Sequence, residues 1–148
     1  MRRRRNGQAL VEFALVAPIF FLLLFGIIEG GRFILYYQTL NNATQEGARY
    51  AIVHGSRSSC PSGSPMEAGI TPPACYDPTG AKVVQRVKDT AFGLLGTSVT
   101  VTPTWPTHEN ARDSDVTVTA TYTYNTLVPL IPLPPITITA ESTLVINH

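Results

Sequence analysis

Charged residues are scarce in this chain, and one long stretch has none at all. Asp, Glu, Lys and Arg make up 14% of the 148 residues, and no charge occurs between Phe13 and Ile28. Four of the eleven basic residues form a run at positions 2–5, so the remainder of the chain is mildly acidic. Because no basic patch exists outside that run, we expect no nucleic-acid partner.

The chain also has few of the residues that carry catalysis or hold metals. Its three histidines are scattered, at His54, His108 and His148. No Ser/His/Asp or Cys/His arrangement and no phosphate-binding loop can be argued from the sequence. The acidic segment 109–115 is more typical of a polar turn before a strand than of a cation site. We therefore predict no enzyme activity, no metal and no cofactor.

Cysteine is limited to Cys60 and Cys75. These residues bracket most of a segment at 57–79 that is rich in Ser, Pro and Gly and is predicted to be a loop. Two cysteines outside the membrane usually pair, so we expect a disulfide between them. The alternative is two free thiols in the same loop.

The N-terminal part of the chain is long and apolar. A helix of about 20 residues crosses a bilayer, and basic residues on one side of it place that side in the cytoplasm. We predict a basic leader at 1–7, a transmembrane helix at 8–29, an amphipathic helix outside the membrane at 30–54, and an extracytoplasmic α+β domain at 55–148. A conventional cleaved signal peptide and an uncleaved signal anchor are the alternatives.

Helical periodicity continues beyond the apolar segment. Apolar residues recur at helical spacing from Phe33 to Ala51, which predicts one helix from about Gln8 to His54, roughly 70 Å long. Gly26 and Gly30 form a G-x-x-x-G pair, a pattern that permits the close approach of another helix.

The C-terminal half shows two further patterns. Asp77 and Pro78 predict the start of a short second helix, as N-cap and first helical residue. Val/Thr and Ile/Thr alternation at 99–102, 116–124 and 136–146 then predicts about three antiparallel strands. The expected fold is α+β, with a long helix and a short helix covering a small sheet. The apolar, proline-rich segment Leu127–Pro135 is predicted to be a loop that meets the membrane surface, a partner subunit or the domain's own core.

The stretch GQALVEFALVAPIFFLLLFGIIEGGR resembles the TadE-like family, pilin-like proteins of the tight-adherence branch of type IV pili. Gln45–Tyr50 resembles the helix that follows the membrane in this family. The last two strands, with the proline-rich loop between them, resemble the family's C-terminal half. The resemblance implies that a prepilin peptidase cleaves between Gly7 and Gln8 on the cytoplasmic side of the membrane.

Glu12 would be the fifth residue of the cleaved chain. Cleavage would expose an α-amino group at Gln8, one helical turn away, and opposite charges near a bilayer are less costly paired than apart. The amine can pair with Glu12 of its own chain or of the next subunit, which would set axial register in a filament. In the alternative, Glu12 stays protonated or reaches the headgroups. Many pilins begin with a methylated Phe, so the sequence leaves methylation of Gln8 open.

These observations predict a minor pilin or pseudopilin-like protein that functions in the assembly of a tight-adherence pilus. The expected partners are the membrane, prepilin peptidase, other pilin-like subunits and the assembly machinery, in a homo- or hetero-oligomer. The expected location is the cytoplasmic membrane, as a single-pass protein with the N-terminus inside and the domain outside, and a surface pilus after incorporation. One alternative is the main structural subunit of the filament, and another is an uncleaved, signal-anchored binding or adhesin module.

Overall fold

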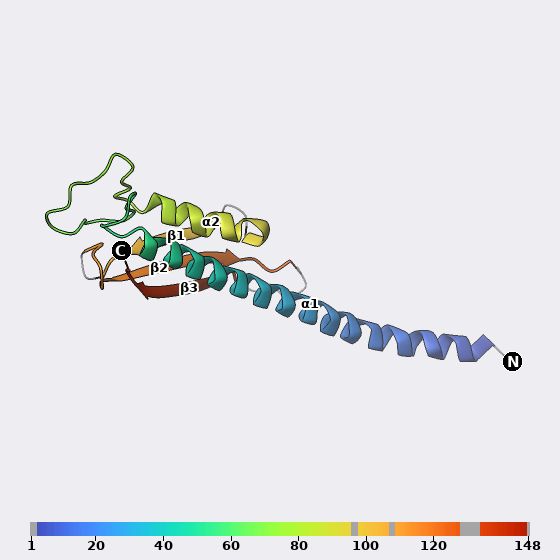
Figure 1. Ribbon diagram of the computed structural model, residues 1–148. Coiled ribbons are helices and arrows are strands. Elements are labelled where there is room, and N and C mark those ends of the chain that lie inside the picture. Colours follow the sequence, from blue (N-terminus) through green and yellow to red (C-terminus); the bar gives the residue numbers. More distant parts are fainter. Residues whose placement is uncertain (1–2, 96–97, 107–108, 128–133, 148) are drawn as a thin grey trace.

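The computed structural model describes residues 3–95, 98–106, 109–127 and 134–147. The elements are α1 (Arg3–Val53), α2 (Ala81–Leu95), β1 (Thr100–Thr104), β2 (Asp115–Tyr124) and β3 (Ile136–Val145). Both helices cover one face of the three-stranded sheet, and the first part of α1 projects far beyond it (Figure 1). The predicted α+β fold is confirmed, and α1 ends one residue before the expected His54.

The sheet is an antiparallel meander in the order β1-β2-β3. On its inner face, β2 contributes the buried residues Val116, Val118 and Ala120. On its outer face, every side chain is threonine except those of Asp115, Glu141 and Val145. The threonines lie beside one another across the strands, with Thr102 opposite Thr119 and Thr121 opposite Thr139. The alternation of period two in the sequence therefore corresponds to one buried and one solvated face.

The core lies between the sheet and the two helices. It is formed by buried residues of α1 (Leu40, Ala43, Ala48, Ala51), of α2 (Val83, Val87, Ala91) and of the strands. The two helices approach each other closely at Gly47, where a Cβ atom would lie 2.3 Å from Cγ2 of Val87. Small residues on α1 thus allow α2 and the sheet to pack tightly against it.

The second helix begins at Ala81, so the predicted start at Pro78 is wrong. Gly80 precedes the helix with a φ of +69°, a conformation that few other residues adopt without strain. Asp77 still satisfies the free N–H groups of the helix start, because its Oδ2 accepts the Lys82 N–H at 2.8 Å. Asp77 therefore caps α2 from four residues before its first residue, across the turn that Gly80 completes, rather than from the position next to the helix.

The α1–α2 connection lies at the end of the domain opposite to the projecting helix (Figure 1). A disulfide joins Cys60 to Cys75, with their Cα atoms 5.3 Å apart. Buried Asn110 holds the same segment from the other side: its Nδ2 donates to the Ser62 carbonyl at 3.0 Å and its N–H to the Pro65 carbonyl at 2.8 Å. Side-chain and covalent contacts thus order a segment that has few apolar residues of its own.

Candidate functional site

The projecting segment of α1 exposes nearly all of its side chains. Leu10, Phe13 and Ile27 are 68%, 69% and 74% exposed, and the same holds for most apolar residues between them. Contiguous exposed apolar surface of this extent marks contact with a membrane or with other protein. Among the described residues, α1 is the one helix that is long and apolar enough to cross a membrane.

The predicted maturation and assembly residues all lie in this projecting segment. Gly7, Gln8 and Glu12 are helical and exposed, and the spacing of Gln8 and Glu12 places them on the same side of α1, one turn apart. No hydrogen bond or ion pair joins the Glu12 carboxylate to another described residue. Their roles in cleavage and assembly stay predictions.

Gly26 and Gly30 are also on the open surface of α1. A Cβ atom built on either residue meets no other atom within 4 Å. Within the described part of the chain, the pair is therefore not used for packing, in contrast to Gly47. Its predicted role in packing against another helix stays a prediction.

The structure reveals a cluster where α1 enters the domain, which we call the collar. It consists of Glu29, Arg32, Phe33 and Tyr36 of α1 and of Tyr122 and Tyr124 of β2. One carboxylate connects the two elements: Glu29 Oε1 accepts the Tyr124 hydroxyl at 2.5 Å and the Leu127 N–H at 3.2 Å. The other oxygen of Glu29 lies 3.2 Å from Nη1 of Arg32. Glu29 therefore holds both the end of β2 and the turn after it.

Aromatic rings fill the space around this ion pair. The ring of Tyr36 stacks on Tyr122 and lies edge-on to Tyr124, with centroids 5.5 Å apart in both pairs. Phe33 meets Tyr124 edge-on at the same distance. The Arg32 guanidinium lies 5.7 Å from the centroids of both Tyr36 and Tyr124, close enough for cation–π attraction. The collar is thus a packed contact that fixes the direction of α1 relative to the sheet.

Burial and the hydrogen bond to Glu29 together raise the pKa of Tyr124 to about 12. The phenol therefore stays protonated at neutral pH and remains a donor to the carboxylate. Arg32 balances the negative charge of Glu29, so the collar brings charges together without a net charge of its own.

The sequence indicates core and cross-strand packing for Tyr122 and Tyr124, and it marks Glu29 only as the first charge after the apolar run. The i, i+3 spacing of Glu29 and Arg32 is a local signal for their ion pair. The contact with β2 has no such signal, because the partners are distant in the chain.

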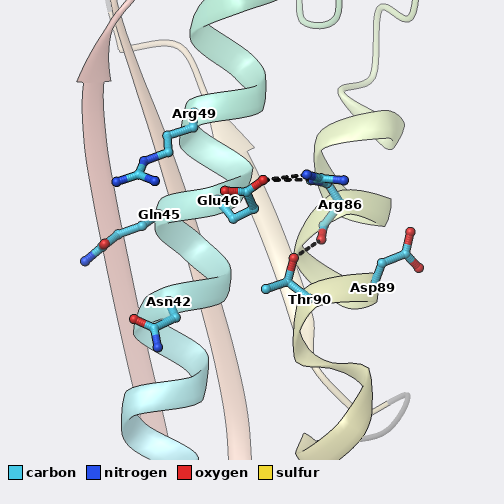
Figure 2. A pocket seen from close by; sticks show the side chains of 7 residues that line it. All are labelled: Asn42, Gln45, Glu46, Arg49, Arg86, Asp89 and Thr90. Atoms are coloured by element: carbon cyan, nitrogen blue, oxygen red, sulfur yellow. Dashed lines mark hydrogen bonds and ion pairs between the residues drawn. The ribbon is translucent and has the colours of Figure 1, made fainter.

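An open polar groove of about 610 Å³ runs between α1 and α2 (Figure 2). Its lining residues are Asn42, Gln45, Glu46, Arg49, Arg86, Asp89 and Thr90. Glu46 and Arg86 form an ion pair across it at 2.5 Å. Arg49 and Asp89 point to opposite sides, away from that pair (Figure 2). The ion pair between Glu46 and Arg86 connects the two helices across the groove. Because these two charges already neutralise each other, they are not free to bind a ligand. Among the described residues, no three His, Cys, Asp or Glu side chains are grouped for a metal ion.

The apolar segment and the collar can be compared with known families. Residues 7–49 match the family model of TadE-like proteins. The TadE-like match covers the projecting segment, the α1 half of the collar and the part of α1 that packs on the sheet up to Arg49. It confirms the resemblance and supports a pilin-like protein associated with a tight-adherence pilus. Neither the curated proteins nor the solved structures gave a match.

Proposed function

We propose that this chain is a minor pilin-like subunit that serves the assembly of a tight-adherence pilus. The observation that carries the proposal is the TadE-like match over residues 7–49, because it includes the whole apolar segment of α1 that projects clear of the domain. Residues 8–29 span the cytoplasmic membrane in this proposal, with the basic leader inside and residues 30–148 outside. The other pilin-like subunits and the assembly machinery are its partners.

Maturation is the first step of the proposed function. Prepilin peptidase removes residues 1–7 and leaves Gln8 as the new N-terminus. Gly7 has open space around it, since a Cβ atom there would meet nothing within 4 Å. The new α-amino group and Glu12 then lie on one side of α1, which supports a role for this pair in the contact with a neighbouring subunit.

The N-terminus of the protein in its own host tests this proposal. Mass spectrometry of the protein from native membranes should find a chain that begins at Gln8. A Gly7→Leu variant should keep Met1 or Arg2 at its start, whereas a matched Gly31→Leu variant should be processed normally. Wild-type protein that retains the leader would overturn the proposal and favour the signal-anchored binding module. The abundance of the processed chain in purified filaments separates a minor subunit from the main one.

A further inference from the structure

We propose that the domain rests directly on the outer surface of the bilayer, with the side chain of Leu127 inserted among the lipid headgroups. This inference depends on the proposed membrane span of α1. The occupant of the surface is lipid, rather than a second copy of the chain.

The level of Leu127 relative to the membrane follows from one hydrogen bond. Its N–H lies 3.2 Å from Oε1 of Glu29, the residue that ends the proposed span. The turn after β2 therefore sits beside the last turn of the span and not above it. Leu127 is 71% exposed, and Ile28 of α1 is 48% exposed at nearly the same level. Two exposed apolar side chains from different elements thus continue the apolar surface of the projecting helix onto the domain.

The collar has the composition of an interfacial layer. Tyrosine is enriched where membranes meet water, because its ring is apolar and its hydroxyl is polar. Tyr36 lies about 10 Å beyond Glu29 along the helix, and a headgroup layer is roughly 5–8 Å thick. The rings of Tyr36, Tyr122 and Tyr124 therefore fall within and just above this layer when the span ends at Glu29.

Charge also favours lipid as the occupant. The one cation of the collar, Arg32, is held by Glu29 and lies over the rings of Tyr36 and Tyr124. A paired charge costs less near the hydrocarbon boundary than an unpaired one. Contact with the bilayer then depends on apolar side chains and aromatic rings, so it does not need anionic lipid.

Spin labels on introduced cysteines test this arrangement, because the native cysteines are already paired. The full chain is placed in vesicles of phosphatidylethanolamine and phosphatidylglycerol, labelled at Ile19→Cys, Leu127→Cys or Val53→Cys. Val53 is a matched control, since it is an exposed apolar residue at the far end of α1. Collisions with oxygen report lipid, and collisions with a water-soluble nickel complex report water. We expect the nickel accessibility at 127 to be several-fold lower than at 53 but higher than at 19, because the headgroup layer excludes the nickel complex less than the middle of the bilayer does.

The outcomes separate this inference from the proposed function. A label at 127 that is as accessible to nickel as the label at 53 overturns the docking, while a lipid-exposed label at 19 leaves the anchor intact. A label at 19 that is open to nickel overturns the anchor itself. A label at 127 that neither reagent reaches shows protein contact and also overturns the docking. Adding Tyr124→Phe should raise the nickel accessibility at 127, whereas Tyr122→Phe should not.

Discussion

The Tyr124 hydroxyl donates a hydrogen bond of 2.5 Å to the Glu29 carboxylate, although 95 residues separate the two in the chain. Tyr124 ends β2, and Glu29 follows the exposed apolar residues of α1. The bond therefore connects the sheet to the base of the projecting helix. The angle between the projecting helix and the domain is therefore set by this contact as well as by the packing of the hydrophobic core.

Removal of this bond should weaken the folded domain. Tyr124→Phe leaves a charged acceptor without its phenol donor, so we expect the free energy of unfolding to fall by about 1–3 kcal/mol. The measurement is denaturant unfolding of the full chain in detergent micelles, followed by circular dichroism. Tyr122→Phe is the control, because its ring also stacks on Tyr36 but the structure gives its hydroxyl no bond to Glu29. Equal losses from both variants would contradict this role for the bond.

The same contact predicts a loss of stability at alkaline pH. The pKa of Tyr124 is raised to about 12 in the folded protein, above the ordinary value of 10, by burial and by the bond to Glu29. The unfolded chain therefore loses this proton first. The stabilisation is complete below pH 10 and disappears as the pH rises to about 12. The free energy of unfolding, measured at several pH values between 10 and 12, should fall more steeply with pH for the wild type than for Tyr124→Phe. The same pH dependence in both proteins would refute the assignment.

Asp77 should govern stability at acid pH. Burial opposes its ionisation, but hydrogen bonds from the Lys82 backbone, Ser62 and Thr79 outweigh burial and lower its pKa to about 2 from 3.8. This contribution is present above pH 4 and is lost as the pH falls to about 2. Asp77→Asn should cost about 1–3 kcal/mol at neutral pH and show a weaker acid dependence. Asp89→Asn, on the exposed side of α2, is the control for the loss of one charge.

Side chains added at two glycines of α1 should differ in their effect on the stability of the domain. Gly47→Ala forces a methyl group against Val87 in the core, so we expect a loss of about 1–3 kcal/mol in the free energy of unfolding. At Gly26 an added Cβ atom has open space around it, so Gly26→Leu should leave domain unfolding unchanged. If Gly26 packs against another helix, the Leu variant should instead lower incorporation into pili. Normal incorporation of a stable Gly26→Leu variant would argue against that packing role.

Glu12→Gln should separate assembly from folding. The substitution keeps the shape of the side chain and removes its charge. Glu12 belongs to the first part of α1, which projects far beyond the domain (Figure 1). Unfolding of the domain should not change, and membrane insertion should become easier because a costly charge is gone. Pilus assembly or incorporation of the subunit should fall sharply in a strain that lacks the wild-type copy. Glu141→Gln on the outer face of the sheet is the matched control, and normal assembly with Glu12→Gln would falsify the idea.

The sequence predicts the elements of this fold well because periodicity is a local property. Val116, Val118 and Ala120 alternate with threonine, and the structure buries all three. The start of α2 is missed because the Asp77 carboxylate reaches Lys82 across a turn that Gly80 completes at positive φ. The bond between Glu29 and Tyr124 leaves no periodic trace, so tertiary structure is needed to find it. Of the apolar loop Leu127–Pro135, residues 128–133 lie outside the described residues.

The outer face of the sheet has a consequence for the behaviour of the protein in different media. Threonine hydroxyl groups neither gain nor lose a proton across the biological pH range, and salt does not screen them as it screens charges. Asp115 and Glu141 are the ionisable residues among the side chains of this face. The surface therefore keeps nearly the same chemical character in fresh water, in brine and in acid. The hydroxyl groups of this face therefore give it a polarity that depends little on the pH and the salt content of its surroundings.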